Sequence, residues 1–196
     1  MECKTHTSRY KGKRFTVIDT PGLADRNTAE QNFEVLQQIA HQLRNMGQDH
    51  VSGVIYFHSI ENTRIQGSDM ANFRILRAIC GEAFFPRVAF ITTRWDRIKW
   101  DQTVENRNQA LENERRKLLP TGPKIFKFLN DGESHRSVLD YFFSLPMPPN
   151  TQLRFTQELK LYRWDRKLDK AVKKTGAGKE VAAHSKKVRR GICSFL

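Results

Sequence analysis

The chain has little cysteine and no long apolar run. Its three cysteines, Cys3, Cys80 and Cys193, are far apart in 196 residues. An odd number with this spacing argues against a disulfide framework or a metal cluster and suits a reducing compartment. No apolar stretch approaches the roughly 20 residues that a membrane-spanning helix needs, and no apolar leader follows Met1. We therefore expect an intracellular, cytoplasmic globular protein.

Acidic residues are also scarce, most of all near the C-terminus. The net charge is +13. Residues 151–196 hold 13 Lys and Arg against 4 Asp and Glu, which gives +9, whereas residues 1–150 hold 21 against 17, which gives +4. This imbalance predicts an anionic partner for the C-terminal region, either nucleic acid or an acidic membrane leaflet.

Apolar runs alternate with segments of helical periodicity along most of the chain. The pattern predicts strands at 14–19, 51–58, 87–93 and 124–129, and helices at 28–46, 68–80, 103–119 and 134–145. A strand–helix alternation of this kind indicates an α/β fold with a mostly parallel sheet covered on both faces. Prolines in residues 146–150 predict a stiff connector after a domain spanning 1–145. Beyond it, we expect a long basic helix over 151–175 and a loose tail from Gly176.

Two short motifs follow predicted strands. In the first, Asp19-Thr20-Pro21-Gly22, the carboxylate of Asp19 could hold Mg²⁺ through water, and Gly22 could offer its N–H to a γ-phosphate. Ligands of open α/β sheets bind beyond that end of a strand. The alternative is an ordinary Pro-Gly turn.

In the second motif, Thr93-Arg94-Trp95-Asp96, the carboxylate of Asp96 can accept hydrogen bonds from N1–H and the exocyclic amine of guanine. Adenine lacks this donor pair, so the contact discriminates between the bases. Arg94 could stack on the base. The alternative is that Asp96 caps a helix. The two motifs in this order favour a guanine-nucleotide site more strongly than either alone.

The chain resembles a fungal branch of the immunity-associated (AIG/IMAP-type) GTPases, which are septin-like P-loop proteins. The resemblance covers about residues 13–145 and is carried by Val51-Ser52-Gly53-Val54-Ile55-Tyr56-Phe57-His58, Asn62-Thr63-Arg64-Ile65-Gln66-Gly67-Ser68, Asn72-Phe73-Arg74, Cys80-Gly81 and Thr92-Thr93-Arg94-Trp95-Asp96. It implies a three-layer P-loop NTPase fold that binds GTP and Mg²⁺, and an assembly of copies through this GTP-binding (G) domain.

The family's phosphate-binding loop, Gly-x-x-x-x-Gly-Lys-Ser, is missing from the sequence. Gly12-Lys13 and Gly178-Lys179 lack the loop and the following Ser or Thr. By the resemblance, the first strand, the loop and the next helix belong ahead of Met1, so we expect an N-terminally truncated domain. The missing strand would lie between the strands 14–19 and 51–58, and its absence either exposes their edges or forces them to pair.

The resemblance also suggests weaker site residues. Thr5 or Thr7 occupies the region of the family's switch threonine and is the candidate on the Mg²⁺ side, although either could be a plain strand residue. Asn130 follows a strand where GTPases contact the guanine carbonyl, and a simple turn is its alternative. His58 could approach the nucleotide or be structural. No catalytic residue can be named; Leu23 follows the first motif, so any hydrolysis should be slow or need dimerisation.

The C-terminus carries a basic cluster, Lys186, Lys187, Arg189 and Arg190, before Cys193-Ser194-Phe195-Leu196. A terminal Cys box with upstream charge predicts membrane association by prenylation and an anionic leaflet, against the alternative of a solvated tail. Three functions remain open: a GTP-binding switch, a non-catalytic pseudo-GTPase interaction module, and a basic nucleic-acid binder. We expect the last least, because residues 176–192 contain no aromatic residue.

Overall fold

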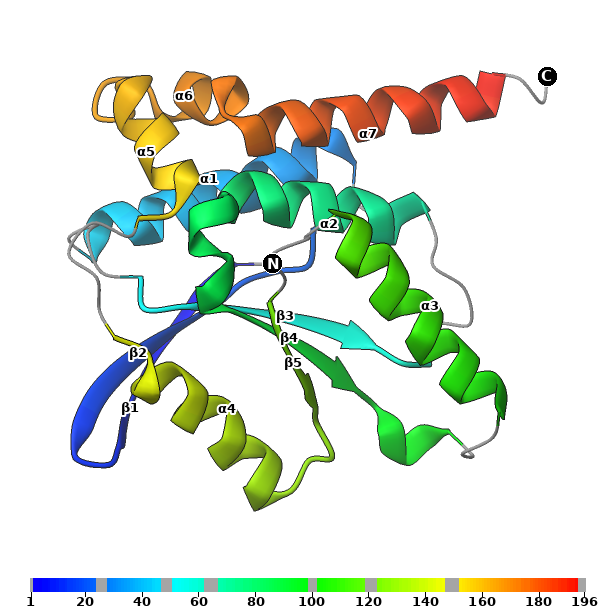
Figure 1. The fold of residues 1–196 in the computed structure, drawn as a ribbon. Helices are drawn as coiled ribbons and strands as arrows, with labels where there is room; N and C mark the ends of the chain where they lie inside the picture. Colours follow the sequence, from blue (N-terminus) through cyan, green and yellow to red (C-terminus); the bar gives the residue numbers. More distant parts are fainter. Residues whose placement is uncertain are drawn as a thin grey trace.

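The computed structural model describes residues 2–23, 28–46, 51–61, 67–98, 102–118, 123–146 and 152–193. The strands are β1 (Lys4–Tyr10), β2 (Lys13–Asp19), β3 (Val54–Ser59), β4 (Val88–Thr93) and β5 (Lys124–Lys127). The helices are α1 (Ala29–Asn45), α2 (Gly67–Cys80), α3 (Gln102–Leu118), α4 (Gly132–Ser144), α5 (Arg154–Leu161), α6 (Leu168–Lys174) and α7 (Gly176–Cys193), with 3₁₀ turns η1 (Glu82–Arg87) and η2 (Trp95–Arg97) (Figure 1).

The central sheet has the strand order β3-β4-β5 and is parallel throughout, which confirms the predicted α/β class. Side chains of β4 alternate between the faces of this sheet, as strand geometry requires. Phe90 packs with Phe73 of α2 and Leu111 of α3, whereas Ile91 packs with Val138 of α4. Helices therefore lie on both sides of the sheet.

The strands β1 and β2 form a separate antiparallel hairpin. Its turn is Lys11-Gly12, and both residues have positive φ, 48° and 77°, as tight hairpin turns require. The hairpin contacts α4 through the ring of Phe143, which meets Tyr10 and Phe15 edge-on. Strands β2 and β3 do not pair, so of the two outcomes expected for the missing strand, the structure has separate sheets.

Local sequence signals explain the start of α1 and the end of α2. Thr28 and Gln31 form a reciprocal capping box at the start of α1. Gly81 ends α2 with φ 72°, and its N–H donates to the carbonyl of Arg77 at 2.9 Å, which is the usual glycine stop. Gly53 lies so close to the ring of Phe142 that an added Cβ would meet it at 2.1 Å.

The C-terminal region differs from its prediction. The expected single helix over 151–175 is broken into α5 and α6, and the expected loose tail is the helix α7. These helices lie across α1 and α2 (Figure 1) and share their largest apolar cluster, with Phe155, Leu159, Trp164, Val172 and Val181 buried. In the sequence, the apolar residues of these helices are interspersed with lysines, so they form no continuous apolar run. Their buried apolar face was therefore not predicted. Within the described residues, none of the helices has the length and apolarity needed to span a bilayer.

Candidate functional site

The carboxyl ends of β4 and β5 lie at one edge of the sheet, because the strands are parallel neighbours. Thr93 ends β4, and its Oγ1 donates to the carbonyl of His58 at 3.3 Å. Arg94 then adopts the left-handed conformation, φ 63°, and starts the turn η2 that contains Asp96. The side chain of Asp96 is exposed at this edge. Because Arg94 occupies the cap position of η2, Asp96 does not act as its helix cap.

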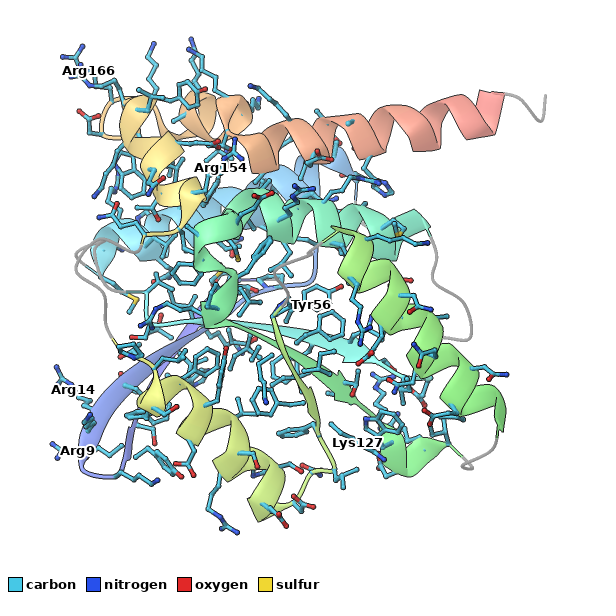
Figure 2. The ribbon with its side chains drawn as sticks, viewed as in Figure 1. Arg9, Arg14, Tyr56, Lys127, Arg154 and Arg166 are labelled. Atoms are coloured by element: carbon cyan, nitrogen blue, oxygen red, sulfur yellow. The ribbon has the colours of Figure 1, made fainter. Side chains whose placement is uncertain are left out.

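Trp95 anchors this turn. It is buried, and its indole N–H donates to both the carbonyl and the hydroxyl of Thr92 at 3.1 Å. Lys127, the last residue of β5, places its ammonium 4.2 Å from the centre of the Trp95 ring, and Figure 2 marks its position at this end of the strand. A cation over an indole face is an attractive contact. The backbone that presents Asp96 is thus fixed from two strands.

Arg94 has a partner that the sequence analysis did not identify. Its Nη1 donates to Oε2 of Glu61 at 2.7 Å, and this hydrogen bond lowers the pKa of Glu61. Glu61 follows β3, so the ion pair joins the ends of β3 and β4. The sequence signal that could have identified this pair is that Glu61, an acidic residue, comes just after the strand that neighbours β4. The guanidinium is thus paired with Glu61, while the Arg94 side chain remains half exposed.

Asn130 reaches the same edge beyond β5. It is exposed and left-handed, φ 60°. Next to it, Asp131 caps α4 by accepting from the N–H of Ser134 at 2.7 Å, and this bond lowers the pKa of Asp131. The predicted turn alternative is therefore realised, and the residue still lies beside the η2 edge. The structure brings Thr93, Arg94, Asp96 and Asn130 to one edge of the sheet.

The residues expected on the phosphate and Mg²⁺ side belong to the separate hairpin. Asp19 ends β2 opposite Lys4, and Gly22 follows it. Thr5 lies opposite Ile18 and donates to Oε1 of Gln42 at 3.4 Å. Thr7 lies farther from Asp19 along β1, with its hydroxyl 3.2 Å from that of Thr16. Both threonines are strand residues, and Thr5 is the nearer to Asp19 in register.

A magnesium ion has no complete site among the residues that the structure describes. No group of three or more His, Cys, Asp or Glu side chains there could hold a metal. Mg²⁺ in nucleotide sites keeps waters and takes few protein ligands, with phosphates supplying the rest. Asp19 and Thr5 therefore fit Mg²⁺ only as partners of a bound phosphate chain.

The Thr175–Lys179 segment, which contains the Gly178-Lys179 pair, has its glycine amides hydrogen-bonded within the protein. The N–H of Gly176 donates to Oε2 of Glu158 at 2.6 Å, and the N–H of Gly178 donates to Oγ1 of Thr175 at 3.1 Å. A Cβ on Gly178 would meet the carbonyl oxygen of Val172 at 2.2 Å. Both glycines lie at the start of α7; Gly178 allows close packing against α6, whereas Gly176 faces Ala78 of α2 and Glu158 of α5. Gly12, the other glycine before a lysine, lies in the hairpin turn.

His58 is buried on the α2 side of the sheet. Its Nδ1 is 3.9 Å from Oδ1 of Asp69, and the centre of its ring is 6.1 Å from that of Phe90. Burial lowers the pKa of His58, and the charge of Asp69 opposes this shift. The geometry agrees with the structural interpretation of this histidine.

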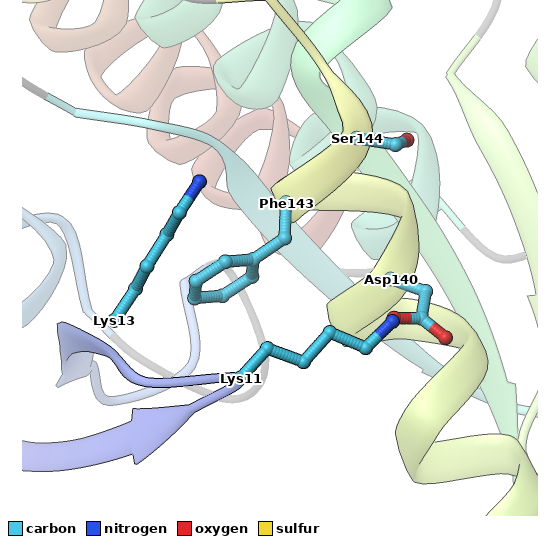
Figure 3. A pocket seen from close by; sticks show the side chains of 5 residues that line it. All are labelled: Lys11, Lys13, Asp140, Phe143 and Ser144. Carbon is cyan, nitrogen blue, oxygen red and sulfur yellow. The ribbon is translucent and has the colours of Figure 1, made fainter.

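A pocket near the hairpin lies apart from these residues. Figure 3 shows it between the hairpin turn and the end of α4, lined by Lys11, Lys13, Asp140, Phe143 and Ser144. The ammonium of Lys11 is paired with Oδ1 of Asp140 at 2.5 Å, so one of the two lysines that line the pocket already has an acidic partner. None of the predicted site residues lines it.

In comparisons with known proteins, no family model and no curated protein matched the chain. The candidate site therefore stands on the geometry of this structure.

Proposed function

We propose that the chain carries the base-recognition half of a guanine-nucleotide site in a P-loop GTPase-type domain. The carrying observation is the η2 turn, which presents the exposed carboxylate of Asp96 at the carboxyl edge of a parallel sheet, with Asn130 at the end of the adjacent strand. Ligands of open α/β sheets bind at this edge. A carboxylate there accepts from both guanine donors, and Trp95 and Lys127 fix its backbone in advance.

The open side of β3 supports the proposal that a further strand, a phosphate-binding loop and a helix complete the site. In the described residues β3 pairs only with β4. On the α4 side of β3, Ile55 is 37% and Phe57 58% exposed. An unpaired edge next to exposed apolar side chains is what remains when a sheet lacks one strand and its covering helix.

The backbone N–H groups of Gly176 and Gly178 already donate to Glu158 and Thr175, so they are not free to bind a phosphate. This favours a second candidate function, a non-catalytic pseudo-GTPase interaction module. Backbone N–H groups around the phosphates supply much of the affinity for a nucleotide. We therefore expect Mg²⁺-GTP to bind the purified chain more weakly than micromolar by calorimetry. A micromolar or tighter dissociation constant would show that other residues cradle the phosphates and would overturn the division of the site proposed above.

Base choice tests the first candidate directly. Saturation-transfer NMR at millimolar nucleotide should detect guanosine monophosphate in preference to adenosine monophosphate. Asp96→Asn should shift that preference toward xanthosine monophosphate, because an amide donates to the xanthine carbonyl. Asp19→Asn, on the hairpin, is the matched control and should leave base choice unchanged. No guanine preference in the wild type, or an unchanged preference in Asp96→Asn, removes Asp96 from the site and leaves the interaction module.

A further inference from the structure

The outer surface of the C-terminal helices concentrates positive charge. From the last turn of α5 through α6, residues 160–174 contain seven basic and two acidic residues. All seven basic side chains, Lys160, Arg163, Arg166, Lys167, Lys170, Lys173 and Lys174, are exposed. We call this segment the basic cap. Its inner side is apolar and buried, with Trp164, Ala171 and Val172 packed into the core, so the charges stand on a fixed surface.

The protein neutralises little of this charge. Arg163 is 3.7 Å from Asp165, and Asp169 lies in the first turn of α6, where the helix dipole favours a carboxylate. Lys173 and Lys174 lie over the rings of Phe33 and Tyr162. Arg166, Lys167 and Lys170 take part in none of the ion pairs between described residues. Figure 2 shows Arg166 at the outer end of the cap, directed away from the body of the protein.

An exposed leucine lies inside the basic cap. Leu161, the last residue of α5, is 72% exposed, more than any other large apolar side chain among the described residues. Its backbone is held by the turn that follows it. There, the backbone N–H of Tyr162 donates to the carbonyl oxygen of Glu158 at 2.9 Å, and the backbone N–H of Trp164 donates to the carbonyl oxygen of Leu159 at 3.1 Å. An exposed apolar side chain on an ordered backbone, within a segment rich in basic residues, matches the bilayer interface, where headgroup charge lies next to hydrocarbon.

We propose that the basic cap docks on an anionic phospholipid leaflet, with its cations among the headgroups and Leu161 inserted at the acyl boundary. Single-stranded nucleic acid fits this surface less well, because single strands are bound by stacking on exposed aromatic rings. In the cap, Trp164 is buried and Tyr162 is half-buried beneath Lys174. The proposal is independent of the nucleotide site and does not require lipidation of Cys193, whose side chain lies outside the described residues.

Flotation of the full chain with vesicles tests the docking surface. We expect binding to phosphatidylserine-containing vesicles, little binding to pure phosphatidylcholine, and loss of binding at high salt. Each basic residue near an anionic leaflet contributes roughly fivefold to partitioning. The triple variant Arg166→Glu, Lys167→Glu, Lys170→Glu should therefore lower partitioning by about a hundredfold or more.

A matched control separates this surface from net charge. Arg9, Lys13 and Arg14 are exposed on the hairpin, and Figure 2 shows Arg9 and Arg14 far from Arg166. Reversing these three charges changes the net charge equally and should leave most of the binding. Leu161→Asn should lower partitioning about tenfold, whereas Leu129→Asn, at an exposed leucine outside the basic cap, should not. Circular dichroism verifies that each variant is folded.

Equal losses for the cap and hairpin triples would overturn the proposal, because binding would then follow net charge alone. Tighter binding to duplex or single-stranded oligonucleotides than to anionic vesicles at the same salt, abolished by the cap triple, would reassign the surface to nucleic acid. Wild-type protein that stays with the vesicle-free fraction at low salt would also overturn it.

Discussion

The two faces of the β3–β4–β5 sheet are covered unequally. On the α2 side, packing continues from the sheet through α1 and α2 to α5, α6 and α7, and the largest apolar cluster lies between those helices. On the α4 side, Ile91 is buried but Phe57 is mostly exposed. Hydrophobic stabilisation scales with the apolar area removed from water. The difference indicates that packing on the α2 side carries most of the stability, and that the α4 side remains available to a further element.

A matched pair of phenylalanines should show the largest effect. Phe155 of α5 is fully buried, whereas Phe57 of β3 is exposed. Phe155→Ala should lower the free energy of unfolding by about 3–5 kcal/mol, through lost burial and the cavity left behind. Phe57→Ala should change it by less than about 1 kcal/mol. Urea denaturation measures both values. Similar losses in the two variants would contradict the inequality of the faces.

A pair of glycines at the start of α7 should show an intermediate effect. Gly178→Ala forces a Cβ against the carbonyl of Val172 and should cost about 1–3 kcal/mol through overpacking. Gly176→Ala meets Cβ of Ala78 at 3.5 Å, an ordinary contact, and should be neutral or slightly stabilising because alanine favours the helix. Thermal unfolding compares them. A larger loss in Gly176→Ala would mean that α7 does not pack closely on α6.

The smallest effect should come from one titrating group, His58, on the covered side. Burial lowers its pKa from the ordinary 6.5, so the unfolded chain binds its proton first as the pH falls. The unfolding free energy should therefore decrease below about pH 6.5, down to the native pKa. In His58→Gln the dependence on pH should be flatter, whereas His41→Gln, at an exposed position, should keep the wild-type slope. Melting temperatures measured from pH 7.5 to 5 test this prediction. Equal slopes of melting temperature against pH in all three proteins would mean that His58 does not contribute to the pH dependence of stability.

Much of the parallel sheet could be predicted from the sequence, because its strands are short apolar runs bounded by glycine, proline and helical periodicity. The observed β4, Val88–Thr93, lies within a residue of the range expected. The bounds of β2, Lys13–Asp19, were predicted equally well, but β2 belongs to the antiparallel hairpin and not to the parallel sheet. The strand β1, by contrast, was not assigned. It is almost wholly exposed and shows no apolar alternation, so only its pairing with β2 identifies it.

The candidate site divides in the same way. The position of Asp96 after an apolar strand is a local property, and the sequence determines it. The ion pair between Arg94 and Glu61, and the contact of Lys127 with Trp95, join residues about thirty positions apart in the chain. Such pairs depend on which strands become neighbours, and periodicity within one segment carries no information about that.

The sequence by itself determined the α/β class, the order of strands and helices over residues 13–145, and the basic character of the C-terminal region. Only the tertiary structure decided that this region is packed, that its charges form an outer surface over a buried apolar one, and that β2 and β3 do not pair with each other. The physical reason is that charge and local periodicity belong to single segments. Burial depends on which distant apolar faces meet, and most helical stability in proteins comes from such packing.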